Sequence, residues 1–313
     1  MSGVTASRLL VDAGQTGTRL RVIGADGHVV DTVAGPVDTS HDVVEQVADR
    51  VRETLSNGDY RIDEVAVGLS GLTDGAARPD ALRHRLAHFG VGRVILAHDS
   101  VTAYLAANGT HHGVVVAAGT GVVTLGVGPE GVARVDGWGH LLGDAGSAYW
   151  IGRSGLEAAM RAFDGRAEPS ALMRAAIDEF GPLPDLYMVL QADPARVSRI
   201  AGFARTVDSL TGNNRTGDAA ATAILAAAGA ELAESAAAAL VRTGPRTGEG
   251  ARVSWTGTVL THSKRVRRSF LDRLAENASD AVVGPPLGEP IDGVGQLFDL
   301  EPDHPLFSQV TRT

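Results

Sequence analysis

LLVDAGQTGTRLRVI, residues 9–23, is the stretch that decides the fold. An apolar run enters a glycine-bearing turn at Gly14–Gly17 and an alternating run leaves it, which predicts a buried strand, a tight turn and a returning strand. Asp26-Gly27 then marks a second hairpin. The glycine-bearing turn therefore joins strand to strand, whereas in a dinucleotide-binding fingerprint or a P-loop it would join strand to helix.

A second copy of this pattern follows at residues 113–128, GVVVAAGTGVVTLGVG. An apolar run again enters a Gly/Thr turn, an alternating run leaves it, and residues 129–131 mark a further hairpin. Gly/Thr hairpins are common, so coincidence is one explanation. Two such units opening similar blocks of sequence favour the other, which is a duplicated domain.

The remaining pattern alternates strands and helices. Buried strands are predicted at Glu64–Leu69 and Arg93–His98, and helices at Pro79–Phe89 and from Asp99 onward. This alternation predicts an α/β architecture with buried sheets. The second half is richer in helix, with predicted segments at 147–163, 170–180 and 218–241.

The 313 residues exceed the length at which one hydrophobic core usually stops growing, so two domains are expected. We place them at residues 1–108 and 109–313, with the last helix, near 292–300, packing back on the first domain.

Composition excludes several classes of function. A formal net charge of −9 argues against binding nucleic acid, and the absence of cysteine excludes disulfides, thiolate nucleophiles and cysteine-ligated metal sites. Lys264 is the only lysine, so the chain has no GK[ST] phosphate loop. We see no leader and no apolar stretch long enough to cross a bilayer, and we therefore expect a cytoplasmic protein without a membrane partner.

The first turn is a candidate phosphate loop. Gly14 would let backbone N–H groups approach phosphate oxygens, Gln15 and Thr16 add polar groups, and Asp12 at the strand end could hold Mg²⁺ through the waters of the ion. The alternative is a surface hairpin whose aspartate caps the turn.

The second turn is the matching candidate. Gly119, Thr120 and Gly121 offer the same backbone, but Ala117 stands at the position corresponding to Asp12. Two phosphate loops with one metal-holding acid would suit a single Mg²⁺-triphosphate.

Asp99 follows a buried strand and begins a helix. A carboxylate there could accept the proton of an attacking hydroxyl group, as positioned acids do in phosphoryl transfer. From position alone the alternative is favoured, because Asp is among the best helix N-caps.

Residues 137–147, GWGHLLGDAGS, are the most unusual segment. Trp138 could lie against the apolar face of a sugar, Asp144 could accept protons from its hydroxyl groups, and the backbone amides at the following helix start could bind an anion. The alternative is a long structural turn with Trp138 as a packing anchor. The density of glycine favours a loop that a ligand approaches.

These motifs together resemble the sugar kinase/hsp70/actin superfamily, and within it the N-acetylglucosamine kinase branch that is grouped with the BadF/BadG/BcrA/BcrD-type ATPases. The resemblance runs from Leu9 to about Tyr149 and returns at 253–295, and the segment 137–151 is its most specific part. It implies an actin-like, ribonuclease H-like α/β fold with two domains, duplicated sheets and an inter-domain cleft.

The resemblance also implies roles for residues. Asp12, Gly14 and Thr16 match the first phosphate site with its Mg²⁺, Gly119-Thr120-Gly121 the second, and Gly257-Thr258 the adenosine-binding turn. Asp99 matches the catalytic base, which moves the balance from cap to catalysis. The positions that match the sugar pocket are Ser70, Gly71, Trp138, Gly139 and Asp144.

The implied activity is transfer of the γ-phosphoryl group of ATP to an amino sugar at O6, by a homodimer. Some residues depart from the family pattern: Ala13 and Gln15 replace two loop glycines, Ala145 stands where Glu is common, and Asp38 stands where binders of N-acetylated sugars usually have Asn. An acid at position 38 would suit a free 2-amino group. N-acetylglucosamine, glucosamine and N-acetylmuramic acid therefore all stay open as acceptors, and so does a relative that binds ligand without turnover.

Overall fold

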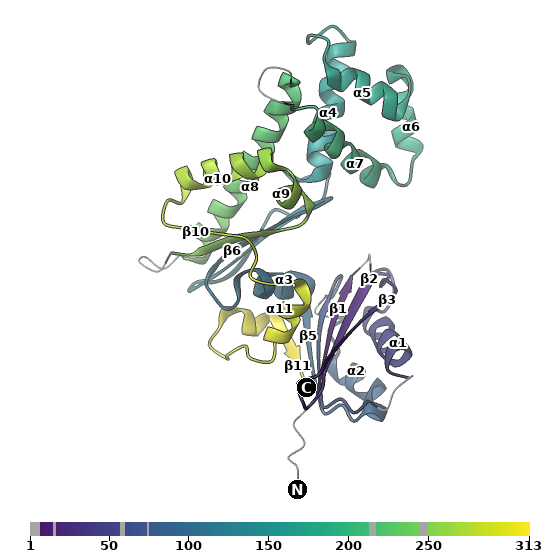
Figure 1. Cartoon of the computed structure of the whole chain (residues 1–313), viewed down its shortest axis with the longest axis vertical. Coiled ribbons are helices and arrows are strands. Elements are labelled where there is room, and N and C mark those ends of the chain that lie inside the picture. Colours follow the sequence, from purple (N-terminus) through teal and green to yellow (C-terminus); the bar gives the residue numbers. More distant parts are fainter. Residues whose placement is uncertain (1–6, 15–16, 57–59, 74, 213–216, 245–249) are drawn as a thin grey trace. The chain divides into compact units, whose positions relative to one another are not determined.

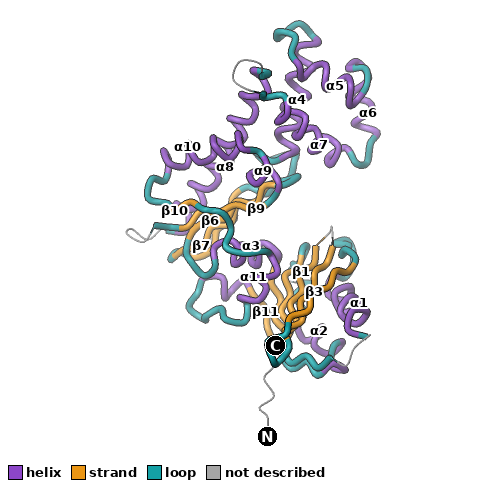
Figure 2. The backbone as a smooth tube through the Cα atoms, in the orientation of Figure 1, coloured by secondary structure: helices purple, strands orange, loops and turns teal. Residues whose placement is uncertain are grey.

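The computed structural model describes residues 7–14, 17–56, 60–73, 75–212, 217–244 and 250–313. The chain divides into two compact units (Figure 1). Unit 1 comprises Met1–His111 and Pro285–Thr313, and unit 2 comprises His112–Gly284. Each unit contains one sheet with helices against it (Figure 2), so each is described by itself.

The sheet of unit 1 has the strand order β11-β5-β4-β1-β2-β3. A meander of three antiparallel strands, β1–β3, is followed by β4 and β5, which run parallel to β1, and β11 pairs antiparallel with β5. The strands are β1 Arg8–Gly14, β2 Gly17–Ile23, β3 Val29–Ala34, β4 Glu64–Leu69, β5 Arg93–His98 and β11 Val310–Arg312.

Helices cover both faces of this sheet (Figure 1). On one face are α1 (Val43–Leu55) and α2 (Pro79–Arg85), followed by a short 3₁₀ helix, Ala87–Phe89. Helix α1 begins at Asp42, whose side chain accepts from two backbone N–H groups, and its valines at i, i+4 and i+8 (Val43, Val47, Val51) pack into the core. The other face carries α3 (Asp99–Asn108) and α11 (Pro290–Gln296).

Helix α3 fits between two glycines. A Cβ atom at Gly68 on β4 would lie 2.5 Å from Thr102 Oγ1, and one at Gly293 on α11 would lie 1.9 Å from the carbonyl oxygen of Thr102. A side chain at Gly68 would displace the Thr102 side chain, and one at Gly293 would displace the backbone of the helix. Because α3 is buried by β4 on one side and α11 on the other, the position of its first residue, Asp99, is set by both.

The sheet of unit 2 has the strand order β10-β9-β6-β7-β8. Its strands are β6 Gly113–Ala118, β7 Val122–Gly128, β8 Gly131–Val135, β9 Arg252–Thr256 and β10 Val282–Val283. Three antiparallel strands are again followed by two parallel ones, so this order repeats β5-β4-β1-β2-β3 strand for strand. The predicted duplication and the predicted α/β class are confirmed.

The helices of unit 2 fall into two groups. Helix α8 (Ala219–Thr243) packs on β6–β8 and against α10 (Lys264–Asn277), and α9 (Thr258–His262) follows β9. A second group contains α4 (Ala148–Phe163), α5 (Ala171–Phe180), α6 (Leu186–Ala192) and α7 (Arg196–Ser209), with α4 against α5 and α7. Short 3₁₀ helices lie at Leu183–Asp185 and, in unit 1, at Pro305–Gln309.

Helix α8 corrects one expectation. Among the described residues it alone is long and apolar enough, by length and composition, to cross a membrane, although no such stretch was expected from the sequence. Its alanine-rich sequence raises the hydropathy, but 44% of that window is buried, against the sheet and α10. A core helix of a soluble protein passes the same test, so this is weak evidence for a membrane span.

The C-terminal segment belongs to unit 1, whereas the sequence analysis placed residues 109–313 together apart from a last helix packing back. Strand β11 pairs with β5, and Arg21 Nη1 on β2 lies 2.7 Å from Asp292 Oδ1 on α11. These pairings are non-local, and no local pattern in residues 285–313 indicates them. The first division lies at 111/112 rather than 108/109.

Candidate functional site

The acidic residues of unit 1 gather where parallel strands end. In the register of the sheet Asp12 on β1 pairs with Gly68 on β4, and Leu69 pairs with His98 on β5. Ser70 and Asp99 therefore come directly after the carboxyl ends of neighbouring strands, beside Asp12. This edge of an α/β sheet is where ligands usually bind.

Ser70 joins two of these strand ends. Its backbone N–H donates to the carbonyl oxygen of Ala13 at 3.0 Å, and its Oγ donates to Asp99 Oδ2 at 2.5 Å. The predicted first phosphate loop, the predicted sugar residue Ser70 and the predicted base Asp99 are thus brought together within one unit.

The N-cap of α3 is His98, not Asp99. The Nδ1 atom of His98 lies 3.2 Å from the backbone nitrogen of Ser100 and 2.9 Å from Asp99 Oδ1. This single nitrogen either accepts from the Ser100 N–H as the cap or, when it carries a proton, donates to the carboxylate of Asp99. The cap interpretation of Asp99, favoured from position alone, is wrong. Strand β5 ends at His98 and Asp99 is already the first residue of α3, so the cap position falls on His98. The carboxylate of Asp99 instead faces Ser70 and His98.

The two carboxyl groups have opposite pKa shifts. Burial acts to raise the pKa of Asp99, but hydrogen bonds with His98 and Ser70 outweigh it, so its pKa lies below the usual value. Burial and the charge of Asp99 raise the pKa of Asp12, although the charge of Arg19 acts in the opposite direction. Asp99 is therefore held in its ionised form. The charge of Asp12 is compensated only in part, by Arg19, so its pKa stays above the ordinary value.

The residues around Asp12 fit a magnesium ion held through water. Within the described ranges, no group of three or more acidic or histidine side chains could hold a metal ion by itself. Mg²⁺ needs only one or two carboxylates when waters and phosphate oxygens complete its shell. The missing positive charge at Asp12 is consistent with such a site, whereas a site made wholly of protein ligands is not.

Asp38 and Gly71 lie in two neighbouring loops of unit 1. Gly71 has φ of +73°, and a Cβ atom there would lie 2.7 Å from Thr39 Cγ2, so the two loops touch closely. The Asp38 carboxylate accepts from Ser40 N–H at 2.9 Å and Ser40 Oγ at 2.6 Å, and it lies 2.9 Å from His41 Nδ1. These hydrogen bonds lower the pKa of Asp38 to about 2.

The second predicted phosphate turn lies in unit 2, between β6 and β7. The backbone N–H of Gly119 donates to the carbonyl oxygen of Gly121 at 2.9 Å. The first amides of α4 close the turn from the other side: Ala148 N–H donates to Gly119 O at 2.9 Å and Tyr149 N–H to Thr120 O at 3.1 Å. Helix α4 is thus fixed directly against the turn.

We expected from the sequence that the backbone amides at the start of α4 could bind an anion, but in the structure these amides have other partners. Its third amide, that of Trp150, donates to the capping Ser147 Oγ at 3.1 Å. All three amides already have protein partners, and an anion would have to displace them. The helix start instead holds the phosphate turn in position.

Asp144 connects this turn to the glycine-rich loop. The residue is 8% exposed, and a Cβ atom at Gly121 would lie 2.7 Å from Asp144 Oδ2. Burial above all raises the pKa of Asp144, with the charge of Asp136 adding to it, while the backbone N–H groups of Val122 and Gly139 act in the opposite direction. The structure thus brings Asp144, Gly139 and the second phosphate turn together.

Asp136 shapes the glycine-rich loop and was missed by the sequence analysis. Its carboxylate accepts from the backbone N–H groups of Gly137 at 2.6 Å, Asp144 at 2.8 Å and Ala145 at 3.0 Å. Asp136 and Asp144 have φ of 57° and 60°, and they are the non-glycine residues with positive φ in the described chain. An Asp directly before a Gly-rich run was the available signal, because Asp tolerates this conformation better than most residues.

The loop that Asp136 closes presents Trp138 to solvent. Trp138 is 69% exposed, and Gly139 has φ of +80° with open space where a Cβ would be. The neighbouring residue His140 packs edge-on against Tyr149 on α4, with the two ring centroids 4.9 Å apart. The exposed ring agrees with a ligand-contacting role rather than with a packing anchor.

The predicted adenosine turn lies against the same region of unit 2. Gly257 has φ of +85°, and a Cβ atom there would lie 2.4 Å from the carbonyl oxygen of Ala118, the last residue of β6. Thr258 begins α9. The turn 257–258 therefore approaches the backbone that leads directly into Gly119.

Two further points complete the comparison with the predicted site. Gln15 and Thr16, predicted to bind phosphate, lie outside the described residues. Arg19, which was not singled out from the sequence, lies directly opposite Asp12 across the β1–β2 pair. The hairpin closed at Gly14 and Gly17 determines this pairing, so the register was available from the sequence.

Comparison with known proteins identifies first the fold class of this chain and then its family. The fold is that of the actin-like ATPases, with its duplicated sheets. Residues 9–289 match the BadF/BadG/BcrA/BcrD ATPase family. This chain belongs to that family.

Three relatives illustrate the similarity. The chain is 27% identical over 210 residues to an N-acetylmuramic acid/N-acetylglucosamine kinase of Clostridium acetobutylicum, covering 64% of this chain and 69% of that protein. It is 27% identical over 189 residues to an N-acetyl-D-glucosamine kinase of Dictyostelium discoideum, covering 54% and 59%. A solved structure of a candidate N-acetylglucosamine kinase from Chromobacterium violaceum has a TM-score of 0.66 at 25% identity, covering 93% and 98%.

Proposed function

We propose that this chain is an ATP-dependent kinase that transfers the γ-phosphoryl group of ATP to O6 of an amino sugar acetylated at its 2-amino group. The observation that carries the proposal is the Ser70–Asp99 pair, in which an ionised carboxylate lies at the end of a parallel strand beside Asp12. The named relatives are kinases of such sugars, which supports this acceptor class.

Asp99 is the general base of the proposed reaction. The acceptor hydroxyl oxygen attacks the γ-phosphorus atom, its proton passes to Asp99, and the bond to the β-phosphate oxygen breaks with ADP leaving. Ser70 and His98 hold the carboxylate ionised and oriented before the transfer. A positioned base of this kind typically contributes about 10²–10⁴ in rate.

The phosphate side of the proposal rests on backbone groups. The turn Gly119–Gly121 and the loop after Asp12 would receive the phosphates, and the turn 257–258 the adenosine. Asp12 would hold Mg²⁺ through water, and the ion would neutralise charge on the phosphate oxygens. The other residues proposed to contact the acceptor are Gly71 in unit 1 and Trp138, Gly139 and Asp144 in unit 2, with Asp144 acting partly through the backbone groups it already holds.

Glucosamine is a second candidate because Asp38 is a lasting anion. Its pKa of about 2 keeps it charged at neutral pH, and a free ammonium group on the acceptor would be attracted to it. Its oxygens, however, already accept three hydrogen bonds within its own loop. A cytoplasmic location, expected from the sequence pattern, and a homodimer, implied by the resemblance, belong to the same proposal.

The test is ADP release with a panel of acceptors: N-acetylglucosamine, N-acetylmuramic acid, glucosamine and glucose. We expect kcat/KM to be at least tenfold higher for an N-acetylated sugar than for glucose. Release of ADP at the sugar-free rate with all four would overturn the proposal. Asp38→Asn, with Asp49→Asn on α1 as the matched surface control, decides the second candidate: a clear preference for the acetylated sugar that Asp38→Asn leaves unaltered excludes recognition of a free amine by Asp38.

A further inference from the structure

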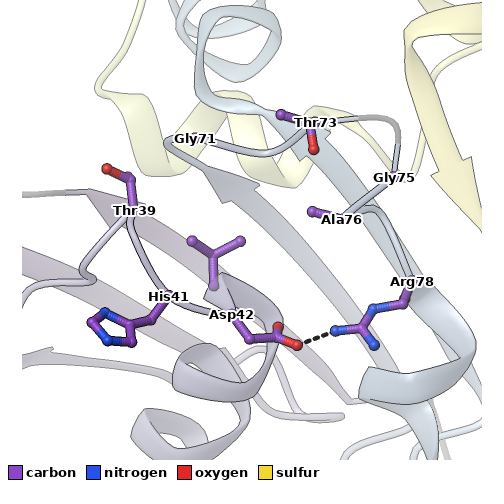
Figure 3. A pocket seen from close by; sticks show the side chains of 9 residues that line it. Thr39, His41, Asp42, Gly71, Thr73, Gly75, Ala76 and Arg78 are labelled. Atoms are coloured by element: carbon purple, nitrogen blue, oxygen red, sulfur yellow. Dashed lines mark hydrogen bonds and ion pairs between the residues drawn. The ribbon is translucent and has the colours of Figure 1, made fainter.

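A pocket of about 420 Å³ opens beside the proposed acceptor site, wholly within unit 1. Figure 3 shows it between the loop that leads into α1 and the residues Gly71, Thr73, Gly75, Ala76 and Arg78, which precede α2. Gly71 lines the pocket and follows Ser70, the residue that bonds Asp99. The pocket therefore adjoins the residues proposed to bind the acceptor, and the proposed reaction assigns it no role.

The space exists because one wall is made of small residues. Gly71, Gly75 and Ala76 line that wall, and a Cβ atom at Gly75 would meet nothing within 4 Å. The hydroxyl-bearing residues Thr39 and Thr73 lie at the upper edge in Figure 3. The wall thus leaves room for a substituent with polar atoms rather than for an apolar side chain.

One cation is held in a fixed position at the end of the pocket. Arg78 donates through Nη2 to Asp42 Oδ2 (Figure 3). Asp42 cannot turn away, because its Oδ1 atom accepts the backbone N–H groups of Val44 and Glu45, each at 3.1 Å, as the N-cap of α1. Arg78 is therefore anchored by one nitrogen, and the other edge of its planar guanidinium group is available to a second acceptor.

The charge of the pocket also suits an anion. Asp42 is offset by Arg78 and by the positive end of α1, and His41, the other titratable residue in the lining, lies 2.9 Å from the Asp38 carboxylate. Among the described residues that line the pocket, a carboxylate would meet a positioned guanidinium group, and the acid there, Asp42, is already paired with Arg78.

We propose that this pocket receives a carboxylate-bearing substituent of the acceptor sugar and that Arg78 binds the carboxylate. This inference rests on the proposed function and names its substrate class. One similar protein acts, by its name, on both N-acetylmuramic acid and N-acetylglucosamine, two sugars that differ by an ether arm ending in a carboxylate. A pocket of this kind would let one site accept both.

The experiment compares three acceptors: N-acetylglucosamine, N-acetylmuramic acid and the neutral carboxamide of N-acetylmuramic acid. In Arg78→Gln we expect KM to rise at least tenfold for the acid and to change less than twofold for the other two, because only the acid loses a charge-assisted hydrogen bond. Arg52→Gln, an exposed residue of α1 paired with Asp49, is the control and should leave all three KM values unchanged.

A second variant tests the space independently of charge. Gly75→Leu should raise KM for both substituted sugars and spare N-acetylglucosamine. Equal effects of Arg78→Gln on all three acceptors, or none on any, would overturn the inference.

Binding of the same sugars without ATP, measured by calorimetry, separates the two proposals. Arg78-dependent binding of the acid without turnover would contradict the kinase activity and leave the pocket assignment intact. Turnover of N-acetylglucosamine with no binding of the acid would contradict the pocket assignment alone.

Discussion

At the scale of single residues, the site depends on two neighbouring carboxyl groups with different environments. Asp99 has hydrogen-bond partners in Ser70 and His98 that favour its charged form, whereas Asp12 is buried beside Asp99 with only Arg19 to offset its charge. Neighbouring titratable groups whose pKa values are pushed apart are typical of functional sites. The first two predictions concern these two groups.

Ser70→Ala should move the acidic limb of the pH–rate profile. The hydrogen bond from Ser70 lowers the pKa of Asp99, so its loss raises that pKa and the limb of kcat/KM shifts to higher pH. The measurement is the pH–rate profile of variant and wild type with a saturating level of ATP. An unchanged limb together with reduced kcat would mean that Asp99 is not the titrating base.

Asp12→Asn should stabilise the fold while abolishing activity. The pKa of Asp12 is raised in the folded state, so the folded protein is most stable while Asp12 is protonated. Its free energy of unfolding falls as the pH rises from the ordinary pKa of Asp through the raised pKa of the folded state. The neutral variant avoids this loss of stability. Urea unfolding should therefore give a higher free energy for the variant at pH 7, and the difference should shrink at acidic pH. A variant less stable than wild type at pH 7 would contradict the assigned environment.

At the scale of elements, the position of Asp99, the proposed base, depends on how α3 is packed. Asp99 begins α3, and the helix passes so close to α11 that no side chain fits at Gly293. The glycine-rich loop depends in the same way on one residue, Asp136, which binds three of its backbone amides. Predictions three and four test these two constraints.

Gly293→Ala should destabilise unit 1 and lower kcat. The new methyl group would lie 1.9 Å from a backbone oxygen of α3, and overpacking of this kind typically costs about 1–3 kcal/mol. Gly295→Ala on the same helix is the matched control, because its Cβ would lie 3.4 Å from a flexible leucine methyl. Urea unfolding and kcat of both variants are the measurements. Equal effects of the two changes would show that α11 does not position α3.

Asp136→Ala should loosen the loop 137–145 more than Asp136→Asn. Alanine removes all three hydrogen bonds and disfavours the positive φ, at a cost of about 2–4 kcal/mol. Asparagine keeps the conformation and part of the bonding. Hydrogen exchange of the amides of Asp144 and Ala145 should accelerate in both variants, and more in Asp136→Ala than in Asp136→Asn. Asp272→Ala on α10 is the exposed control. Unaltered exchange in the alanine variant would contradict the role of Asp136.

The sequence was most informative where structure is local. The stretch 9–23 predicts β1, β2 and their turn, and the repeat at 113–128 predicts the second sheet, because period-two patterns and glycine turns are set by near neighbours. The cap at His98 could not be separated from a cap at Asp99, since the two differ by a single residue of strand. A last helix that packs back on the first domain was expected, and α11 lies in unit 1, but the pairing of β11 with β5 was not predicted, because contacts between segments far apart in the sequence determine it.

At the scale of the whole molecule, two units with the same strand order carry different chemistry. Unit 1 holds Asp12, Asp99 and the pocket next to Gly71, and unit 2 holds the Gly119–Gly121 turn, the 257–258 turn and the Trp138 loop. The duplicated strand–turn–strand unit keeps its acid only in the first copy, where Asp12 stands, and Ala117 takes the place of the acid in the second.

The most direct test of the central claim is ³¹P NMR of the products formed from ATP and N-acetylglucosamine by wild type and Asp99→Asn, with Asp49→Asn as control. We predict that the wild type and the control form the 6-phosphate of the sugar with one ADP each. Asp99→Asn should be at least about 100-fold slower in kcat with a similar KM. A sugar phosphate formed at an undiminished rate by Asp99→Asn, or no sugar phosphate from the wild type, would contradict the account.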